Sequence, residues 1–504
     1  MRLLPVSVKA RYGWAKPRRV GATAQSRTMD PMPYLLSRRT VLATLGAGAL
    51  APVPALAQPT PPLPAAQIVP LPLVPLRRAL KPGGPESLLH TIGGAAPGPV
   101  IRTRRGTLVE LQITNGLDQP TGLHIHGLRT VNSADGLPGL TALPIAPGEA
   151  RAIRIETPDA GTYVYGPCLA GRTAEQRERG LSGVFIVEET HPPPVDLDHV
   201  AALDDVRVSA EGGLIEDFGA RIDSARTGRL GNVLLVNGAV APETVTVRPG
   251  ARIRLRLASL ANARIMPMRF ENMKATVVAL DGQACDPFDP LKRTVVLLPG
   301  SRYDVMLDAP AEAKAEGRVI VALGAGIAVV RFMTEGEALP PRPPVQPLPM
   351  NDVPPSIRLQ NALRAELSIT GGMDKPAPGA PAPRPADVER LFAPNVPVFR
   401  LNGGAANGFS GKPLFTVRRG APVVLAILNR TAWSQVLTVH GHVFRLLHPL
   451  DDGWEPYFMD TLHMPENTLS RIAFDATNPG KWAIRSTNAE HFDAGLFTWF
   501  EVTG

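Results

Sequence analysis

The sequence predicts an all-β protein made of three tandem Greek-key β-sandwich domains. The first observation is an internal repeat, in which a glycine turn precedes a strand, at residues 105–115, 249–258 and 419–429. The turn glycines of the three copies lie 144 and 170 residues apart, which leaves room for one domain per copy. Short segments between glycine and proline turns dominate the rest, and the best helical candidate is the short stretch 173–180.

Each repeat strand has its own predicted burial. The first two copies, at residues 108–115 and 252–258, alternate apolar and polar residues, which predicts strands with one buried face. The third copy, at residues 423–428, is apolar throughout and predicts a strand buried on both faces. Further alternating strands are predicted at residues 150–155 and 303–307, each shortly after a Pro-Gly turn.

Shifts in composition predict the domain boundaries. We expect the three domains at residues 78–190, 195–335 and 357–504. Two proline-rich stretches separate or precede them, and they predict an extended N-terminal segment at 58–77 and a linker at 336–356.

The first 57 residues predict a cleaved export signal. A twin-arginine pattern at 37–42 is followed by an apolar stretch at 41–50 and by an Ala-Leu-Ala cleavage site at 55–57. The alternative is a membrane anchor, but the apolar stretch is too short for about 30 Å of hydrocarbon, and Pro52 and Pro54 break it. We therefore expect export to the periplasm by the twin-arginine route, and a body that does not span the membrane.

The distribution of charge excludes one class of partner. The whole chain carries 53 Lys and Arg against 45 Asp and Glu, but nine of these cations and only one of these acids lie in residues 1–57. Residues 58–504 therefore hold 44 groups of each sign. A nucleic-acid-binding protein needs a standing basic surface, so we expect no nucleic-acid partner. Two cysteines are too few for a disulfide-rich scaffold.

Two histidine pairs carry the chemistry of the sequence. His124 and His126 follow the first repeat strand, and His440 and His442 follow the third. Residues i and i+2 of a strand face the same side, so each pair directs two imidazoles into one space. Imidazole suits copper, zinc, nickel or iron. A single pair could be a polar pair on a solvent face, but two pairs at equivalent places in two copies favour a metal site.

These motifs resemble those of the multicopper oxidases, the laccase-like family with three cupredoxin domains. The similar segments read TGLHIHG (121–127), ADG (134–136), GTYVY (161–165), VHGHVF (439–444), DT (460–461), NPGKW (478–482) and HFDAGL (491–496). The resemblance implies three cupredoxin-like domains. It also implies a type 1 copper in the third domain, held by two His and one Cys. A three-copper cluster held by eight His, where dioxygen becomes water, would lie between the first and third domains.

This sequence departs from that pattern at most of the cluster positions. Three of the eight cluster ligands remain, at His124, His126 and His440. The other five positions hold Gly166, Cys168, Thr438, Arg485 and Thr487. A fixed guanidinium about 5 Å from a divalent ion opposes binding by about 6–7 kcal/mol at an effective dielectric of about 20, and arginine does not lose its proton. The cluster is therefore not expected to form.

The type 1 site keeps one of its three ligands. His491 remains and Leu496 stands at the axial position, but Gln435 and Ser486 replace the other His and the Cys. The thiolate is needed for strong Cu(II) binding and for electron transfer, and a serine hydroxyl cannot replace it. We expect His491 to be a structural residue.

Two interpretations of the remaining residues stay open. His124, His126 and His440 are expected to converge with Cys168, and three His and a thiolate could hold one copper or zinc ion. The other interpretation is that they are leftover polar groups in a half-buried cleft, with Arg485 filling the vacated volume. The expected cofactor is accordingly none or residual copper. The residual metal-site candidates are His124, His126, His440, His491 and Cys168, and no catalytic residue is assigned.

The sequence therefore predicts an exported protein that has lost laccase-type catalysis and acts as a periplasmic binding or scaffold protein. Residues 172–176 and 180–183 resemble the copper-free, twin-arginine-exported cell-division member of the family. The alternatives are a copper-binding oxidoreductase with an altered or reduced metal site, and a protein that stores copper without turnover. We expect an unidentified periplasmic protein or a small molecule as partner, and a monomer.

Overall fold

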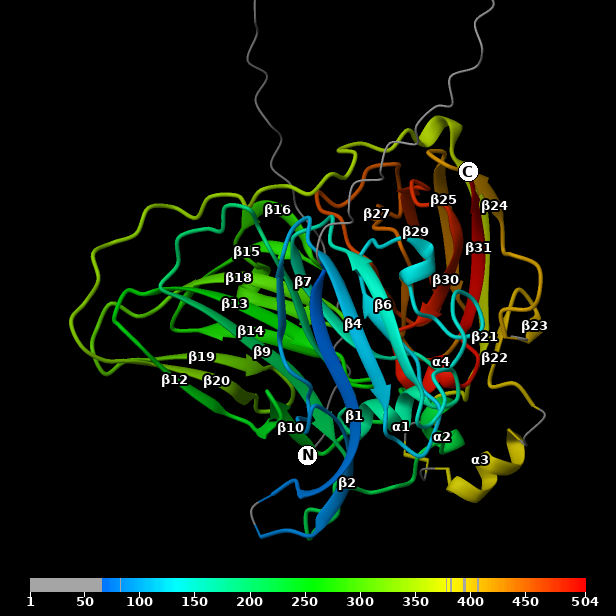
Figure 1. Ribbon diagram of the computed structural model, residues 1–504, viewed down its shortest axis with the longest axis horizontal. Helices are drawn as coiled ribbons and strands as arrows, with labels where there is room; N and C mark the ends of the chain where they lie inside the picture. Colours follow the sequence, from blue (N-terminus) through cyan, green and yellow to red (C-terminus); the bar gives the residue numbers. More distant parts are fainter. Residues whose placement is uncertain (1–65, 82, 378, 381–382, 393–395, 406–407) are drawn as a thin grey trace, which may run out of the picture. The chain divides into compact units, whose positions relative to one another are not determined.

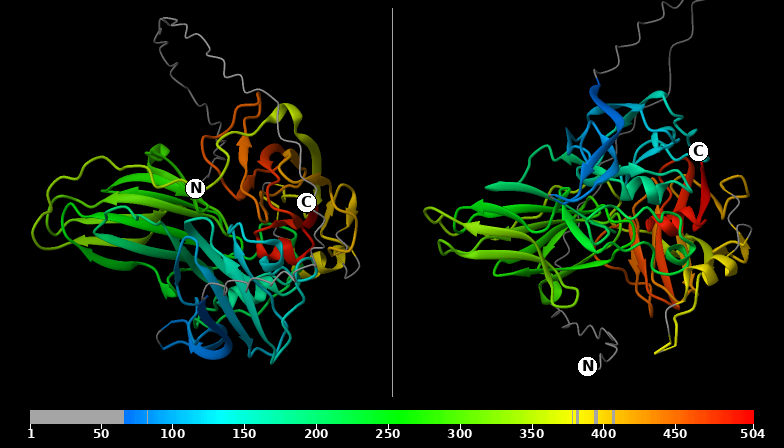
Figure 2. Two further views of the ribbon diagram at one scale, coloured as in Figure 1. Left: turned by 45° about the horizontal axis from the view of Figure 1, so that its top comes forward. Right: turned by 90° about the horizontal axis from the view of Figure 1, so that it is seen from below.

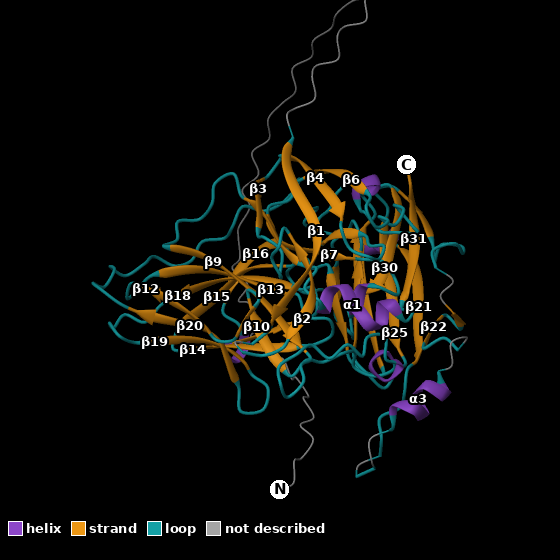
Figure 3. Ribbon diagram, turned by 60° about the horizontal axis from the view of Figure 1, so that its bottom comes forward, coloured by secondary structure: helices purple, strands orange, loops and turns teal. Residues whose placement is uncertain are grey.

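Strands make up nearly all the regular structure of the protein, which is described here from a computed structural model (Figures 1 and 3). The structure describes residues 66–81, 83–377, 379–380, 383–392, 396–405 and 408–504. Strands in six sheets confirm the all-β prediction for this part of the chain. The predicted export signal at 1–57 lies outside the described residues. Within them, no helix is long and apolar enough to cross a membrane.

The repeated unit of the sequence is the central strand of one sheet in each domain. The three copies are β4 (Leu108–Asn115), β13 (Arg252–Ser259) and β25 (Pro422–Asn429). Each central strand has a parallel neighbour on one side, in turn β1 (Gln67–Ala79), β9 (Leu197–Val206) and β21 (Leu363–Gly371). Each has an antiparallel neighbour on the other side, in turn β6 (Ala150–Glu156), β18 (Arg302–Asp308) and β29 (Thr468–Asp475). The three copies therefore occupy equivalent places in their sheets. Figure 2 shows the three groups of strands, coloured blue to cyan, green, and yellow to red along the chain.

The first domain pairs two sheets around one apolar core. Their strand orders are β2-β1-β4-β6 and β3-β8-β7-β5. The strands not yet given are β2 (Glu86–Ile92), β3 (Ile101–Arg104), β5 (Leu123–His126), β7 (Gly161–Pro167) and β8 (Gly183–Glu188). The core takes side chains from both sheets, such as Leu111 and Phe185.

The second domain repeats this arrangement with larger sheets. Their orders are β11-β10-β9-β13-β18-β15-β16 and β12-β20-β19-β14-β17. The strands not yet given are β10 (Val233–Val236), β11 (Ala239–Val240), β12 (Glu243–Val247), β14 (Met266–Glu271), β15 (Lys274–Leu280), β16 (Gln283–Phe288), β17 (Thr294–Leu297), β19 (Glu316–Val321) and β20 (Ile327–Thr334). Leu255 and Phe332 represent the two faces of its core.

The third domain contributes two more sheets. Their orders are β23-β22-β21-β25-β29-β27 and β24-β31-β30-β26-β28. The strands not yet given are β22 (Phe399–Leu401), β23 (Gly404–Ala405), β24 (Thr416–Arg418), β26 (Gln435–Val439), β27 (Arg445–Leu447), β28 (Thr461–Met464), β30 (Gly480–Ser486) and β31 (Phe497–Thr503). Its core includes Leu425 and Trp482.

Helices are short and lie between strands (Figure 3). They are α1 (Thr173–Glu178), α2 (Arg221–Ser224), α3 (Pro385–Leu391) and α4 (Ala489–Asp493), with 3-10 turns η1 (Asn132–Ala134), η2 (Leu291–Arg293) and η3 (Leu359–Asn361). The helix expected near 173–180 is α1. Helix α4 of the third domain contacts the start of α1. The Asp493 carboxylate of α4 accepts hydrogen bonds from the backbone amides of Gly171, Thr173 and Ala174.

The first domain begins earlier than the expected residue 78. Strand β1 pairs with β4 from Gln67 onward, so the part of the proline-rich segment that is described belongs to the sheet. Pro70 and Pro72 are exposed and alternate with buried Leu71 and Leu73. Prolines at every second position leave the same strand edge without N–H donors, and this stretch of β1 has a partner on one side only. A proline-rich composition is compatible with an unpaired edge in this first half of the strand.

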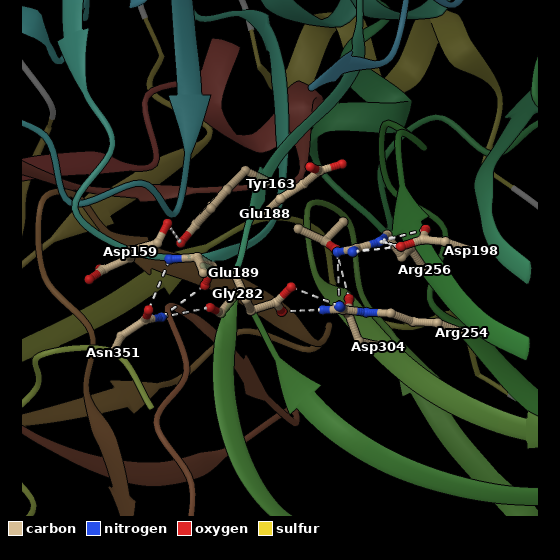
Figure 4. Close-up of polar contacts among 12 residues, drawn as sticks. Asp159, Tyr163, Glu188, Glu189, Asp198, Arg254, Arg256, Gly282, Asp304 and Asn351 are labelled. Atoms are coloured by element: carbon tan, nitrogen blue, oxygen red, sulfur yellow. Dashed lines mark hydrogen bonds and ion pairs between the residues drawn. The ribbon is translucent and has the colours of Figure 1, made fainter. Parts of the chain in front are cut away.

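The second repeat strand is buried on both faces, contrary to the expected alternation. Arg254 and Arg256 of β13 are each only 1% exposed. Figure 4 shows their guanidinium groups meeting Asp304, which accepts from Arg254 Nε at 3.0 Å and from Arg256 Nη1 at 3.2 Å. Arg254 also binds Glu189 of the first domain at 2.6 and 2.9 Å. The polar face of this strand therefore points into the junction of two domains rather than into water.

The linker after the second domain is also fixed against its neighbours. The side-chain amide of Asn351 donates to the carbonyl oxygens of Ala160 at 2.9 Å and Gly282 at 3.2 Å (Figure 4). Its carbonyl oxygen accepts from the Ala160 amide at 2.9 Å. Asn351 thus connects the linker to the first and second domains.

Candidate functional site

Three of the predicted site histidines converge where the first and third domains meet. His124 and His126 lie on β5, and His440 directly follows β26. The rings of His124 and His440 stack with centroids 4.1 Å apart and planes 11° apart, and the His126 ring centroid lies 6.4 Å from that of His124. All three side chains are buried. Two H-x-H motifs from distant parts of the chain thus bring three of their four imidazoles together. The fourth, His442, packs among Phe474, Trp482 and Phe500.

Asp135 is a central residue of this site that the sequence analysis did not single out. His124 Nδ1 donates to the Asp135 carbonyl oxygen at 2.8 Å, and His440 Nδ1 donates to the Asp135 carboxylate at 3.0 Å. The ligand atoms of His124, Asp135 and His440 lie within 4.8 Å of one another. Burial raises the pKa of Asp135 and lowers the pKa of both histidines well below the usual value, so these imidazoles are neutral. The Ala-Asp-Gly motif at 134–136 was the available signal.

Arg485 binds the remaining nitrogen of His440. It lies on β30 opposite Thr438 of β26, another of the replaced ligand positions. Arg485 Nε donates to His440 Nε2 at 2.8 Å, and Nη1 donates to the Ser486 carbonyl oxygen at 3.0 Å. Because His440 Nδ1 donates to Asp135, Nε2 is its only lone pair, and this guanidinium uses it. Burial lowers the pKa of Arg485 to about 10, so the group remains charged at neutral pH.

His126 belongs to a polar junction that includes all three domains. Its Nε2 donates to Thr461 Oγ1 at 2.9 Å and lies 3.2 Å from an Asp460 carboxylate oxygen. Arg302, on β18 of the second domain, binds that carboxylate through two nitrogens at 2.6 and 3.0 Å. Burial lowers the pKa of His126 to about 4, so this imidazole is neutral as well.

Cys168 lies apart from the histidines in an apolar cluster. Its neighbours there include Leu137, Ala483 and Phe492. The thiol donates weakly to the Gly136 carbonyl oxygen at 3.4 Å, and burial raises its pKa to about 12. It is therefore a protonated thiol rather than a thiolate ligand, and it is not disulfide-bonded. The structure does not bring Cys168 into the group formed by the three histidines.

His491 occupies a separate, fully buried position on α4. Its Nε2 donates to the Arg226 carbonyl oxygen at 2.9 Å, and its Nδ1 lies 2.8 Å from the side-chain amide of Gln435. The atom of Gln435 that faces Nδ1 is Oε1, while Gln435 Nε2 donates to Thr431 Oγ1 at 3.1 Å. Burial lowers the pKa of His491 to about 4, so the ring is neutral and carries a single N–H. The Ser486 hydroxyl donates to the Val436 carbonyl oxygen at 3.2 Å.

A small cavity of about 30 Å³ adjoins the histidines at the junction of the three domains. It is large enough for one or two water molecules. Its polar lining consists of His124, His126, Arg177, Ser182, Ser259, Arg485 and Thr487.

The sequence is similar to known multicopper oxidases. Three sequence families, each described as multicopper oxidase, match residues 77–192, 213–322 and 381–504. Multicopper oxidase MmcO of Mycobacterium tuberculosis (strain ATCC 25618 / H37Rv) is 27% identical over 469 residues, which cover 84% of this chain and 85% of that protein. Cell division protein FtsP of Histophilus somni (strain 2336) is 28% identical over 211 residues, which cover 42% of this chain and 44% of that protein.

Solved structures agree with the sequence matches. The crystal structure of multi-copper oxidase from Pseudomonas Thermotolerans superimposes with a TM-score of 0.75 at 26% sequence identity, and covers 87% of this chain and 100% of that chain. Together with the six sheets, this similarity confirms the predicted class of three tandem cupredoxin-like domains.

Proposed function

Because this chain belongs to the multicopper oxidase family, we propose that it is an exported member that works without the family's copper centres. In this proposal it is a non-catalytic binding or scaffold protein of the periplasm. The observation that carries the proposal is the 2.8 Å hydrogen bond from Arg485 Nε to His440 Nε2. In this hydrogen bond a charged guanidinium occupies the lone pair of His440 that a copper ion would need.

The surroundings of this hydrogen bond do not fit a three-copper cluster. Thr438 and Thr487 flank Arg485 at two further cluster positions, and neither offers an imidazole. Cys168, at a fourth position, is a buried thiol with a raised pKa. Arg485 also supplies one positive charge beside the Asp135 carboxylate, where copper ions would otherwise supply several. Arg485 and Asp135 occupy both ring nitrogens of His440, which supports a site that works without a metal.

The type 1 position supports the same proposal. Gln435 Oε1 lies 2.8 Å from His491 Nδ1, and the Ser486 hydroxyl is bonded to the backbone. Without a thiolate there is neither a strong Cu(II) ligand nor an electron path from substrate to a cluster. Oxidase chemistry of the family type therefore lacks both of its centres in this proposal.

Two further observations bear on location and role. The twin-arginine pattern at residues 37–42 supports export to the periplasm. The similarity to a cell division protein, FtsP, over 42% of the chain supports a role in an assembly rather than in turnover. The partner would be another periplasmic protein or a small molecule.

A second candidate function is a copper-binding oxidoreductase with a reduced metal site. The observation that favours it is the group formed by His124, Asp135 and His440, whose ligand atoms lie within 4.8 Å. The similarity to multicopper oxidase MmcO over 84% of the chain points the same way. Such a site would hold one metal ion, and it would require Arg485 to release His440.

Restoring two ligands at the type 1 position tests the proposal. The double substitution Gln435→His and Ser486→Cys, together with His491, completes a set of two imidazoles and one thiolate. We expect this variant to bind about one copper ion per chain and to show an absorption band at about 600 nm. The unmodified protein should show neither. Copper content and the absorption spectrum are measured after copper loading and desalting.

The matched control is Gln435→His with Ser486→Ala, which adds the imidazole but no thiolate. It should remain colourless. A blue band in the unmodified protein would refute the proposal, because the chain would then hold a type 1 copper through ligands other than those assigned.

A further inference from the structure

We propose that a groove between the second and third domains binds an extended peptide segment of a partner protein, which is added as a strand beside β29. The groove is a cavity of about 650 Å³, within the range of about 300–1,000 Å³ that is usual for ligand sites. None of the retained or replaced copper-ligand positions, which all lie in the described chain, lines it. The proposal rests on the proposed function of a binding protein and deepens it by naming the chemistry of the partner.

The edges of three sheets meet at this groove. Its lining includes residues of β17 from the second domain and of β27 and β28 from the third, and each of these strands stands last in its sheet. A sheet edge presents backbone N–H and C=O groups with which a further strand can pair. The edges of β27 and β28 are partly closed, because the Leu446 carbonyl oxygen accepts from the Glu455 amide and the Thr461 amide donates to Asp281 at 3.1 Å.

Strand β29 supplies an open edge in the same groove. It pairs with β25 along its whole length but with β27 only at residues 471–473, so its first three residues have a strand on one side only. The carbonyl of Leu446, opposite Ile472 on β29, points away from β29, and so in this pair both backbones face away from each other. Backbone direction alternates along a strand, so the N–H and C=O of Leu469 point to the open side. Neither group has a partner among the described residues.

Apolar side chains of both domains form most of the lining. They include Val296 and Leu298 of the second domain, and Leu446, Met459, Leu462 and Leu469 of the third. Leu469 is 56% exposed and Val296 is 40% exposed. Single exposed apolar side chains are normal, but their gathering around one cavity marks an interaction site. An added strand would direct every second side chain into this apolar lining, so we expect the peptide to alternate apolar and polar residues.

The charges of the lining favour a basic residue in the peptide. Asp281 accepts hydrogen bonds from backbone amides with both carboxylate oxygens, and Arg471 is paired with Asp452 at 3.0 Å. Glu455 is the one Asp, Glu, Lys or Arg of the lining whose side chain has neither an ion pair nor a hydrogen bond in the described chain. A carboxylate beside an apolar groove attracts Lys or Arg more strongly than it would in open water.

Selection from random heptapeptides displayed on phage tests the proposal on residues 58–504. We expect enrichment of peptides that alternate apolar and polar residues and carry a Lys or Arg. A synthetic copy of an enriched peptide should slow hydrogen exchange of the Leu469 amide about tenfold or more, because that amide becomes hydrogen-bonded. No enrichment, or binding that leaves exchange at Leu469 unchanged, would overturn the proposal. Uptake of only the apolar dye anilinonaphthalene sulfonate would do the same, because the groove would then be a small-molecule site.

Two substitutions at exposed or half-buried positions test the contacts separately. Leu469→Thr keeps the backbone N–H but shortens the apolar side chain, and it should weaken binding of the synthetic peptide about tenfold. Glu455→Gln removes the unpaired charge and should weaken it about twofold to fivefold.

The matched controls change residues of the same kinds that do not line the groove. They are Ile68→Thr, on β1 of the first domain, where Ile68 is 60% exposed, and Glu366→Gln, on β21. Both should bind the peptide as the unmodified protein does. Equal affinity in all four variants would contradict the proposal. Copper content of the same protein is measured separately, so failure here is distinguishable from failure of the proposed function.

Discussion

The substitution Arg302→Met is expected to lower the free energy of unfolding by about 3–5 kcal/mol, because it leaves a buried carboxylate without its cation. The Arg302 side chain is fully buried and binds Asp460 of the third domain through two nitrogens. It also donates to the carbonyl oxygens of Thr162, in the first domain, and Gly300. Burial alone would raise the pKa of Asp460, but Arg302 and His126 hold it well below its usual value. One side chain therefore joins all three domains.

Denaturant unfolding followed by tryptophan fluorescence measures this effect. The matched control is Arg318→Met, because Arg318 is also paired, with Glu271 at 2.7 Å, but half of its side chain is in water. Exposed pairs contribute about 1 kcal/mol or less, so the control should unfold close to the unmodified protein. Equal, small losses for both substitutions would show that the Arg302 junction does not hold the domains together.

The second large effect is expected for Asp304→Asn at the junction of the first and second domains. Asp304 accepts from Arg254, Arg256 and the Thr162 hydroxyl, the last at 2.7 Å (Figure 4). An amide of the same shape removes the negative charge between two buried guanidinium groups. We expect a loss of about 3–5 kcal/mol in the free energy of unfolding.

A double-mutant cycle separates the charge effect from simple packing. Adding Arg256→Met to Asp304→Asn removes one of the two guanidinium groups that lose Asp304 as a partner, so the double variant should lose less than the sum of the single losses. In the single variant Arg256 would keep only Asp198. Arg254 would keep Glu189 as its remaining partner. Strictly additive losses in denaturant unfolding would argue against the shared role of Asp304.

The repeat and the histidine pairs could be predicted from the sequence because both depend on local patterns. Period-two alternation marks β4, and the turn glycine before each central strand has a positive φ, for example 82° at Gly106. The convergence of His124 with His440 followed from two H-x-H motifs at equivalent places in two copies.

The buried arginines of β13 could not be predicted in the same way. An alternating pattern with arginine at every second position normally indicates a solvent face. The groups that neutralise Arg254, namely Glu189 and Asp304, are 65 and 50 residues away in the sequence. Pairing of β13 with β18 brings Asp304 to Arg254, and packing against the first domain brings Glu189. Strand β1 at Gln67–Ala79 was missed for a related reason, since its prolines suggested a linker.

In the candidate site, some residues could be located from the sequence and others could not. The ligand positions identified through the family resemblance lead to His124, His126 and His440, which lie together. The same reasoning placed Cys168 beside them, yet its thiol packs among apolar side chains. Asp135 was not singled out although the Ala-Asp-Gly segment was noted, because its hydrogen bonds with His124 and His440 leave no local pattern in the sequence. Its role depends on contacts with residues up to 305 positions away.

The most direct test of the account is the copper content of residues 58–504 after copper loading and desalting, together with an absorption spectrum. We predict that the protein retains much less than one copper ion per chain and shows no absorption band at about 600 nm. About one copper without the band would instead support the reduced site at His124, Asp135 and His440. Three or four coppers with the blue band would contradict the central claim, because the chain would then hold both copper centres of a working oxidase.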